Sequence, residues 1–546
     1  MLREEKNISA FWGGLLLVAV FLVVYFPLEL HERELYWQEG YYAVQALEMP
    51  NLLLPITVVH GEVISNSFPL YPWLISLLIK IPGMSMELAL RGLSVFCLGI
   101  IALIVWRAAR SAGGVTGALV AVAMLISCNI TIDKVPEGYP LTLMVIFLLS
   151  GWLVWFGLGF GRGDWNHAWM AAMVFGGLAF YTGGFQAILY FLVPLIFMRR
   201  PLNIWRKIHY PGFWIGLGVL VCFILLWGIP YIILSNKLPF TSFPVVEQLR
   251  KYPSHLIEFP LDLLLRSLPW SILAWAPFCV ALFRLDPTPI FSRFLRTIVI
   301  SLLFVTWLNP LAEPRDLIIL IPPLSILTGL NYWILTRRYG DRLIKVMMIP
   351  AWLLIIPAAI IIMFYFIPEE WGLQYLRLDY GLQFREELSH RLVAVIGAAL
   401  LVLISFYLAT GGRQRPLWIW ILLLTSCFSL FSWSLITPYR AQEHPKKDMG
   451  REMRQALERE GVSSKEIIYK SRILDLYNEC YYMGGNVRKI SSLTELPPEQ
   501  KTVYLISTEF PQMPERRWRN LLPERMEYRN KRLCLYQGIL PDDETP

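Results

Sequence analysis

The chain has 546 residues, of which 56% are hydrophobic and only 16% are charged, and its mean hydropathy is +0.50. Soluble domains average about 25% charged residues, so this composition excludes an ordinary soluble protein and predicts an integral membrane protein. The formal net charge of +8 does not indicate a nucleic-acid partner, because the basic residues gather in short loops between apolar runs.

Thirteen apolar stretches run from Ser9 to about Ile436, and we expect each to span the membrane as a helix. A spanning helix needs roughly 20 apolar residues, because lipid offers the backbone no hydrogen-bond partners. The fifth and sixth stretches are short and are separated only by Thr182-Gly183-Gly184, so they could also form one broken hairpin. The predicted spans are residues 9–29, 86–107, 113–132, 139–160, 166–182, 184–198, 212–234, 261–283, 294–309, 316–335, 346–367, 389–410 and 416–437.

The distribution of Lys and Arg predicts the orientation. Short loops after even-numbered spans are basic, whereas loops on the other side are mixed, as in Pro368-Glu369-Glu370. Because Lys and Arg concentrate in cytoplasmic loops, we expect a cytoplasmic N-terminus, and an odd number of spans then places the C-terminal tail outside. The first apolar run lacks a small-residue cleavage site, which indicates an anchor rather than a cleaved signal peptide. The short loops favour a bacterial inner membrane.

The first outer loop, residues 30–85, contains two predicted helices. Apolar and aromatic residues recur at helical spacing in 38–49, which indicates a short amphipathic helix. Residues 69–81 are apolar but too short to span, so they suit a helix at the membrane interface. The polar turn between them contains His60, Gly61, Glu62, Asn66 and Ser67. A second outer loop, 235–260, and a third, 368–388, are also polar.

The tail after the last span alternates helix and strand patterns, which predicts a small α/β domain. The expected helices are 446–460, 472–481 and 513–521, and the expected strands are 467–469, 487–491, 503–506 and short strands near 526–536. We find no Gly-rich phosphate loop there, which favours a lid or docking module without chemistry. Cys480 and Cys534 lie on the side where a disulfide is permitted, and the sequence leaves their pairing open.

The predicted fold class is therefore a polytopic α-helical membrane protein with about 13 transmembrane helices and a small C-terminal α/β extracytoplasmic domain. The predicted transmembrane domain is 1–437, including the extracytoplasmic loop 30–85, and the soluble domain is 438–546.

The first outer loop also carries an ordered series of short motifs. These are Tyr36-Trp37-Gln38-Glu39-Gly40-Tyr41-Tyr42-Ala43, Leu47-Glu48-Met49, His60-Gly61 and Asn66-Ser67-Phe68-Pro69-Leu70-Tyr71-Pro72-Trp73, followed by Arg91-Gly92-Leu93-Ser94. The series resembles the PMT/ArnT-like GT-C membrane glycosyltransferases. That family moves a sugar from a polyprenyl-phosphate carrier to a protein or lipid acceptor on the non-cytoplasmic face. The resemblance implies a GT-C fold with 13 spans and an α/β tail on the outer face.

The chain departs from the family pattern at three positions. The family's catalytic aspartate corresponds to Gln38, which precedes Glu39, and the family's Glu-Lys, a metal ligand and a phosphate contact, is Asn66-Ser67. A histidine that often helps to hold the metal falls at Gln248. Neutral amides hold a divalent cation poorly, although their oxygens can contribute to a site. The resemblance therefore leaves a divalent metal open, and it implies either a metal-independent relative or a relative that has lost glycosyl transfer.

Glycosyl transfer needs a carboxylate to accept the proton of the acceptor's hydroxyl or amine. Glu39 is the first candidate, because it begins the helix predicted in the outer loop; alternatively, it only stabilises the N-terminus of that helix. Glu34 lies about one turn earlier and is the substitute. Glu137 opens the fourth span from the outer side, where the family has an acidic residue before Pro-Leu, so it either lines the pocket or caps a helix.

The departing phosphate gains charge, which Arg or Lys can stabilise in a partly dry site. The resemblance places Arg315 near the carrier phosphate, although an arginine at a membrane edge can instead reach lipid head groups. Arg250 and Lys251 form a second basic pair, and a lone loop histidine such as His255 rarely binds metal. Expected pocket residues are Gln38, Tyr42, Asn66, Ser67 and Gln248.

The function that these patterns predict is inverting transfer of a hexosyl or pentosyl unit from a polyprenyl-phosphate sugar to a lipid or protein acceptor. The alternative is a non-catalytic relative that binds or presents a lipid-linked glycan. A lipid-linked sugar transporter is disfavoured, because the charges gather at the outer ends of the spans rather than at the bilayer midplane.

Overall fold

The protein is described here by a computed structural model. The structure describes residues 10–25, 33–36, 38–49, 55–236, 245–283, 285–286, 288–309, 312–367, 388–410, 416–436, 445–522, 526–528 and 531–540. The described chain divides into two units. The helical unit is Met1–Glu32, Arg91–Leu225 and Ser242–Gln442, and the sheet unit is Arg33–Leu90, Leu226–Thr241 and Glu443–Pro546.

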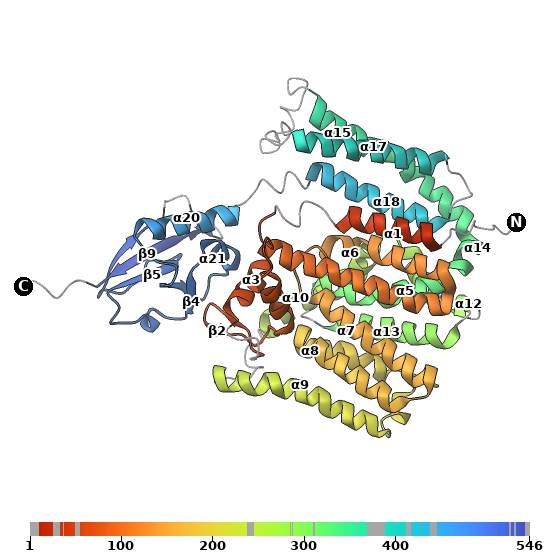
Figure 1. Ribbon diagram of the computed structural model, residues 1–546, viewed down its shortest axis with the longest axis horizontal. Helices are drawn as coiled ribbons and strands as arrows, with labels where there is room; N and C mark the ends of the chain where they lie inside the picture. The colour runs from red at the N-terminus through yellow and green to blue at the C-terminus, as the bar shows by residue number, and fades with distance from the viewer. Residues whose placement is uncertain are drawn as a thin grey trace, which may run out of the picture. The chain divides into compact units, whose positions relative to one another are not determined.

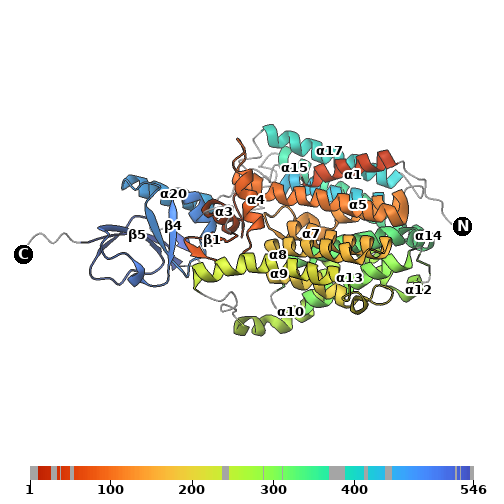
Figure 2. The same ribbon diagram turned by 60° about the horizontal axis from the view of Figure 1, so that its bottom comes forward.

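Long apolar helices dominate the helical unit. Seven described helices are long and apolar enough to cross a membrane, and three shorter apolar helices coincide with the predicted first, eleventh and thirteenth spans. The predicted count of thirteen is therefore not confirmed. The principal helices are α1 (Ala10–Tyr25), α5 (Met86–Ser127), α7 (Leu141–Phe156), α8 (Trp165–Ile196), α9 (Pro211–Ser235), α10 (Val245–Arg266), α13 (Pro289–Leu308), α14 (Ile321–Leu353), α15 (Ile355–Phe366), α17 (Leu388–Thr410) and α18 (Leu417–Phe431). Figures 1 and 2 show α7, α8 and α13 side by side.

Two glycines explain part of the difference between the predicted and the described helices. α5 covers the second and third predicted spans, and α8 covers the fifth and sixth. In each, the helical backbone is interrupted once, at Gly114 with φ 69° and at Gly184 with φ 66°. Glycine adopts this left-handed region without the steric cost that a Cβ brings, so each apolar run can change direction at these positions.

The predicted eighth span, 261–283, is wrong as a single helix. The structure instead ends α10 at Arg266 and continues with α11 (Ser271–Trp275), a 3-10 turn at Ala276–Phe278 and α12 (Val280–Phe283). Pro269 and Pro277 lie at these interruptions, and proline lacks the N–H that an uninterrupted helix requires. The predicted outer loop 235–260 contains the first part of α10, which begins at Val245.

The sheet unit contains a five-stranded sheet in the order β4-β3-β5-β9-β6. Its strands are β3 (Ile467–Ser471), β4 (Asn486–Ile490), β5 (Thr502–Ser507), β6 (Arg517–Asn520) and β9 (Cys534–Ile539). β3 is parallel to β4 and β5, whereas β9 is antiparallel to β5 and β6. α20 (Pro445–Arg459) and α21 (Tyr477–Met483) accompany the sheet (Figure 1). A separate short hairpin joins β7 (Glu527–Tyr528) to β8 (Lys531–Arg532).

Alternation along the strands gives the sheet two apolar faces. Ile468, Val487, Ile506 and Leu535 belong to the core beneath α20 and α21, whereas the neighbouring positions Tyr469, Val503, Leu505 and Tyr536 form a second cluster. Side chains alternate between faces with a period of two, so β3, β4, β5 and β9 each contribute to both clusters. The predicted small α/β domain in the tail is thus confirmed.

The predicted helix 513–521 is wrong, because residues 517–520 form the edge strand β6. Trp518 pairs with Gly538 of β9, and the Trp518 ring occupies the space where a Cβ on Gly538 would lie. Cys480 and Cys534 are both free thiols, and they lie in the two different apolar clusters.

The first outer loop forms the two predicted helices, α3 (Glu39–Glu48) and α4 (Leu70–Leu78). Between them, β1 (Val58–Val59) pairs with β2 (Glu62–Val63) in a hairpin whose turn is His60-Gly61. α3 packs on α21, so the loop and the tail belong to one unit. At this contact the Gly40 N–H donates to Asn478 Oδ1 at 2.9 Å.

We expect Gly40→Ala to destabilise the sheet unit. A Cβ at Gly40 would lie 2.7 Å from both the backbone N and the Cα of Asn478, so the two helices would have to separate. Such overpacking typically costs about 1–3 kcal/mol. Gly228→Ala is the matched control, because no atom lies within 4 Å of a Cβ there. Thermal unfolding of purified protein should show a lower Tm for Gly40→Ala alone, and equal midpoints would contradict the close packing.

Candidate functional site

Glu39, the first candidate base, is the first residue of α3 and is buried, with 4% of its surface exposed. Its Oε2 accepts a hydrogen bond from the Tyr36 N–H at 2.8 Å, just ahead of the helix. A carboxylate is favoured there, because the free N–H groups of a helix N-terminus carry partial positive charge. This bond uses one carboxylate oxygen and holds Glu39 in a fixed position.

Glu34, the substitute base, is engaged in a different contact. Its Oε2 accepts from the backbone N–H groups of Lys446 and Lys447, both at 3.0 Å, at the start of α20. The side chain is buried, and it satisfies N–H groups that a helix leaves unpaired at its first turn. The structure therefore gives Glu34 a structural task that joins the first outer loop to the tail.

Of the pocket residues predicted in the first outer loop, Ser67 contacts the buried Gln45, and the others make separate contacts. Gln38 directly precedes α3, and Tyr42 is buried and packs edge-on against Tyr71. Ser67 Oγ donates to Gln45 Oε1 at 2.7 Å, while Gln45 Nε2 is buried with no hydrogen bond to described residues. Asn66 Oδ1 accepts a hydrogen bond from the hydroxyl of the adjacent residue, Ser65, at 3.2 Å. Gln45 was missed as a site residue. In the sequence, Gln45 follows Gln38 by seven residues and Tyr41 by four, so all three lie on one face of a helix, and this spacing could have indicated it.

In the helical unit, Glu137 lies in the turn between α6 (Asn129–Lys134) and α7. Lys134 Nζ donates to Glu137 Oε1 at 2.7 Å, and it also lies 3.4 Å from Asp133 Oδ2. Glu137 is thus one partner of a partly buried ion pair, in which about a quarter of each side chain is exposed.

Arg315 begins a second polar cluster in the helical unit, in the 3-10 turn Pro314–Leu320 that precedes α14. Its guanidinium forms an ion pair with Glu313, and the guanidinium carbon lies 3.9 Å from the centroid of the Tyr139 ring. The side chain is largely buried, whereas half of the Glu313 side chain is exposed. Arg315 is therefore held in place by an aromatic ring and a carboxylate.

Asp316 is a buried carboxylate that the sequence reasoning missed. Its Oδ2 accepts from Gln186 Nε2 of α8 at 3.3 Å and from the Glu313 N–H at 3.1 Å. Gln186 also donates to the Tyr190 hydroxyl at 2.5 Å. In the sequence, Asp316 follows Arg315 directly at the start of an apolar run, and this pair of adjacent charges could have indicated Asp316 as a site residue.

The remaining candidates lie on α10. Gln248, Arg250 and Lys251 fall within this helix, but their side chains lie outside the described residues. His255 follows on the same helix, with its ring near Tyr252 and Phe259, and its Nε2 is buried without a hydrogen bond to described residues.

The described residues do not offer the ligand set that the family's metal would need. Asn66, which the resemblance aligns with a carboxylate, presents an amide, and the side chain of Gln248 is outside the described residues. The described part of the chain contains no group of three or more His, Cys, Asp or Glu residues arranged to hold a metal ion. Amide oxygens alone are weak ligands for a divalent cation.

His60 joins the hairpin of the first outer loop to the tail. Its ring stacks on Tyr477 with centroids 5.6 Å apart, and its carbonyl accepts from the Lys489 N–H at 3.0 Å. Lys470 and Lys489 are paired neighbours on β3 and β4, and both ammonium groups lie over the Tyr477 ring. Burial, reinforced by these two positive charges, lowers the pKa of His60 to about 2.

We therefore expect acid to loosen the sheet unit. The contribution of neutral His60 is complete above pH 6.5, its ordinary pKa, and falls as the pH drops toward 2, by at most about 1.4 kcal/mol per pH unit. Glu48 accepts from the Gly61 N–H in the same turn, and burial raises the pKa of Glu48. The contribution of Glu48 to stability therefore increases as the pH falls, in the opposite direction to that of His60. Thermal unfolding at pH 7 and pH 5 should show a smaller acid-induced fall in Tm for His60→Phe, which cannot become charged, than for wild type. An equal fall would contradict this role.

Comparison with known proteins places this geometry in context. A family model described as dolichyl-phosphate-mannose-protein mannosyltransferase matches residues 66–227. The chain is similar to the structure of ArnT from Cupriavidus metallidurans bound to undecaprenyl phosphate, with 15% identity, a TM-score of 0.66, and coverage of 97% of this chain and 98% of that chain. The apo state of the same ArnT gives 16% identity and a TM-score of 0.64 over the same shares of both chains. No curated protein matches the sequence.

Proposed function

We propose that this chain is a PMT/ArnT-like GT-C membrane glycosyltransferase whose donor is a polyprenyl-phosphate-linked sugar; the family match over residues 66–227 and the ArnT-like fold support this proposal. The observation that supports this donor is the ArnT-like fold over 97% of the chain, since that ArnT was solved with undecaprenyl phosphate. The proposed acceptor is a lipid or a protein on the non-cytoplasmic face, and the proposed location is a bacterial inner membrane with a cytoplasmic N-terminus.

Glu39 is the proposed general base. Its buried carboxylate accepts the proton of the acceptor's hydroxyl or amine as the acceptor oxygen or nitrogen attacks the anomeric carbon. Attack from the face opposite the phosphate inverts the anomeric configuration, and the bond between the anomeric carbon and the phosphate oxygen breaks. The electron pair of that bond leaves with polyprenyl phosphate. Glu34 ranks below Glu39, because its Oε2 already accepts two N–H groups of α20.

Arg315 is the proposed contact for the carrier phosphate. A guanidinium in a partly buried position stabilises the charge that the phosphate gains as it departs. The Tyr139 ring beneath it fixes the guanidinium plane without consuming its N–H donors. Arg250 and Lys251 are proposed as a second basic pair for the same phosphate chemistry. Glu137 is the proposed reserve carboxylate.

The polar groups of the first outer loop are proposed to orient the sugar. Gln38, Asn66 and Ser67 offer neutral donors and acceptors suited to sugar hydroxyls, and Tyr42 offers an adjacent aromatic ring. Gln248 is proposed to act in the same way. Neutral amides at these positions favour a reaction that needs no divalent metal.

Removal of divalent metal is therefore expected to leave the reaction rate unchanged. Purified protein treated with EDTA and assayed in chelated buffer should turn over a polyprenyl-phosphate sugar as fast as protein supplied with Mg²⁺, Mn²⁺ or Zn²⁺. If EDTA lowered the reaction rate at least tenfold and added metal restored it, metal independence would be contradicted. That result would point to a metal held with the help of amide oxygens.

The donor and the stereochemistry can be tested together. Protein in lipid nanodiscs would be incubated with labelled acceptors and a panel of hexosyl and pentosyl polyprenyl phosphates, with nucleotide sugars as the comparison. The proposal expects transfer from at least one polyprenyl-phosphate donor, none from nucleotide sugars, and an inverted anomeric configuration by NMR. Transfer from nucleotide sugars alone would contradict the proposed donor, and retention of configuration would contradict direct displacement.

A further inference from the structure

A cavity of about 210 Å³ opens at the carboxyl ends of the parallel strands β3 and β5, within the sheet unit. Ser471 is the last residue of β3 and Ser507 is the last residue of β5. The chain leaves β3 toward β4 on one side and leaves β5 toward β6 on the other. Connections that diverge from neighbouring parallel strands leave a crevice between them, which is where open α/β sheets bind ligands.

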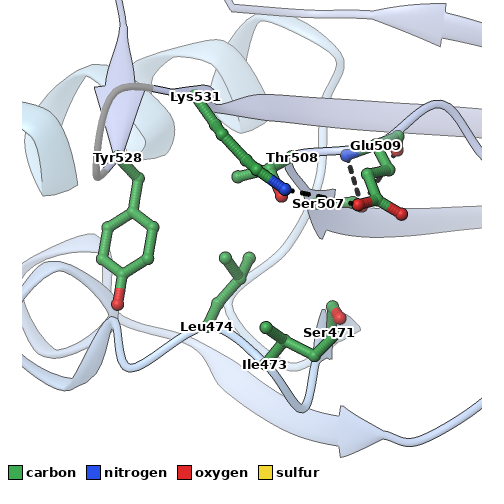
Figure 3. Close-up of a pocket in the computed structure, with 8 residues that line it drawn as sticks. All are labelled: Ser471, Ile473, Leu474, Ser507, Thr508, Glu509, Tyr528 and Lys531. Atoms are coloured by element: carbon green, nitrogen blue, oxygen red, sulfur yellow. Dashed lines mark hydrogen bonds and ion pairs between the residues drawn. The ribbon is translucent and has the colours of Figure 1, made fainter.

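The side chains around this cavity are of mixed character, as Figure 3 shows. Ser471, Ser507 and Thr508 bring hydroxyl groups, and Leu474 and Ile473 bring apolar surface. Ile473 is 81% exposed, an unusual degree for a large apolar side chain at the mouth of a cavity. Tyr528 stands on the opposite side of the cavity from Glu509 (Figure 3).

Charge at the cavity is balanced. Lys531 Nζ lies 3.5 Å from Glu509 Oε1, and both side chains are mostly exposed. An anionic ligand such as a phosphate would meet the Glu509 carboxylate, and a cationic ligand would meet the Lys531 ammonium. A neutral ligand rich in hydroxyl groups can instead donate to the carboxylate and accept from the ammonium, which gives charge-assisted hydrogen bonds at both ends.

Several of the lining groups are held in place by their own contacts. The Tyr528 hydroxyl accepts from the Asp475 N–H at 3.2 Å, which fixes the ring at the cavity edge. Ser507 Oγ accepts from the Glu509 N–H at 3.1 Å and donates to the Glu509 carbonyl at 2.9 Å, which orders the turn that carries Glu509. Preorganised polar groups cost a ligand less ordering entropy on binding.

We propose that this cavity binds one neutral sugar ring, as a carbohydrate subsite in the tail. The ring's hydroxyls would bond to the Glu509–Lys531 pair and to Thr508, and its apolar C–H face would lie against Leu474 and Ile473. The volume is below the roughly 300–1,000 Å³ of sites for drug-sized ligands, so a single ring fits better than an extended glycan. The subsite is independent of the proposed donor, because binding there needs no glycosyl transfer.

The test is saturation-transfer NMR of the full chain in nanodiscs, without any donor. The probes are methyl glycosides of neutral hexoses, with hexose 1-phosphates as the charged comparison. We expect saturable binding of at least one neutral glycoside with a Kd on the order of 1 mM, and weaker binding of the phosphates. In Glu509→Ala/Lys531→Ala the Kd should rise about tenfold or more, because two charge-assisted bonds are lost.

Arg519→Ala/Glu460→Ala is the matched control, since it removes another surface ion pair of the sheet unit, at 3.6 Å, that does not line the cavity. It should leave the Kd unchanged, and equal Tm values for both double variants would show that each is folded. Absence of saturable binding by every neutral glycoside, preference for the phosphates, or an unchanged Kd in Glu509→Ala/Lys531→Ala would each overturn the proposal. These outcomes do not depend on whether the protein transfers sugar.

Discussion

Glu39→Gln is expected to lower kcat for sugar transfer by about 10²–10⁴-fold, the usual contribution of a general base. Glutamine keeps an oxygen that can accept from the Tyr36 N–H, so α3 should begin at the same residue and the Tm should be preserved. The amide oxygen is not basic enough to accept the acceptor's proton. The measurement is the rate of labelled sugar transfer at saturating donor and acceptor.

Two further glutamates serve as controls for Glu39→Gln. Glu34→Gln removes a negative charge from the start of α20, so it should lower stability by about 0.3–1 kcal/mol and leave kcat within a few fold of wild type. Glu62→Gln breaks a surface ion pair with Arg472 and a longer contact, at 4.0 Å, with Lys489; it should leave kcat unchanged and lower stability by no more than about 1 kcal/mol. If Glu39→Gln turned over as fast as these controls, the base would lie elsewhere, and Glu137 would be tested next.

Arg315→Ala is expected to give the second largest loss, a fall of about 10–150-fold in kcat/KM for the donor. This range corresponds to the 1.5–3 kcal/mol typical of a hydrogen bond to a charged group. The unpaired partner, Glu313, is about half exposed, so the loss of the ion pair itself should cost little stability. Steady-state kinetics with varied donor concentration measure the effect.

Glu313→Gln distinguishes a phosphate contact from a structural ion pair. It removes the carboxylate charge beside Arg315 while keeping an oxygen for the turn before α14, so donor KM should stay equal or decrease. Arg315→Lys should keep part of the activity, because it keeps the charge but not the bidentate geometry. If Glu313→Gln and Arg315→Ala lowered Tm and activity in parallel, the pair would be structural and the proposed phosphate contact would be wrong.

Local sequence patterns predicted the local structure well. The period of the apolar residues placed α3 and α20 within one residue and α4 within three, because each helix buries one face. β6 was mistaken for a helix, because Trp518 owes its place to Gly538, a partner 20 residues away. α10 was not predicted, because the polar residues of 235–260 indicated only an outer loop; the structure accommodates Pro253 and Pro260 within the helix.

The contacts that define the candidate site depend on residues far apart in the sequence. Glu39 could be placed at a helix start from its neighbours alone, and Arg315 from the apolar run behind it. The cap that Glu34 provides for α20 joins residues 412 positions apart, and the Gln186–Asp316 bond joins residues 130 positions apart. No periodicity within one segment encodes such pairs, so Asp316 and the structural role of Glu34 emerged only from the fold.

The release of free polyprenyl phosphate over time is the measurement that tests the central claim most directly. Wild-type protein in nanodiscs would be supplied with an excess of a polyprenyl-phosphate sugar and an acceptor mixture, and the liberated carrier quantified by mass spectrometry. Glycosyl transfer predicts many moles of polyprenyl phosphate per mole of protein, with matching sugar gained by an acceptor. Saturable donor binding with no carrier release across the whole acceptor mixture would contradict the account and favour a protein that binds lipid-linked glycan without transferring it.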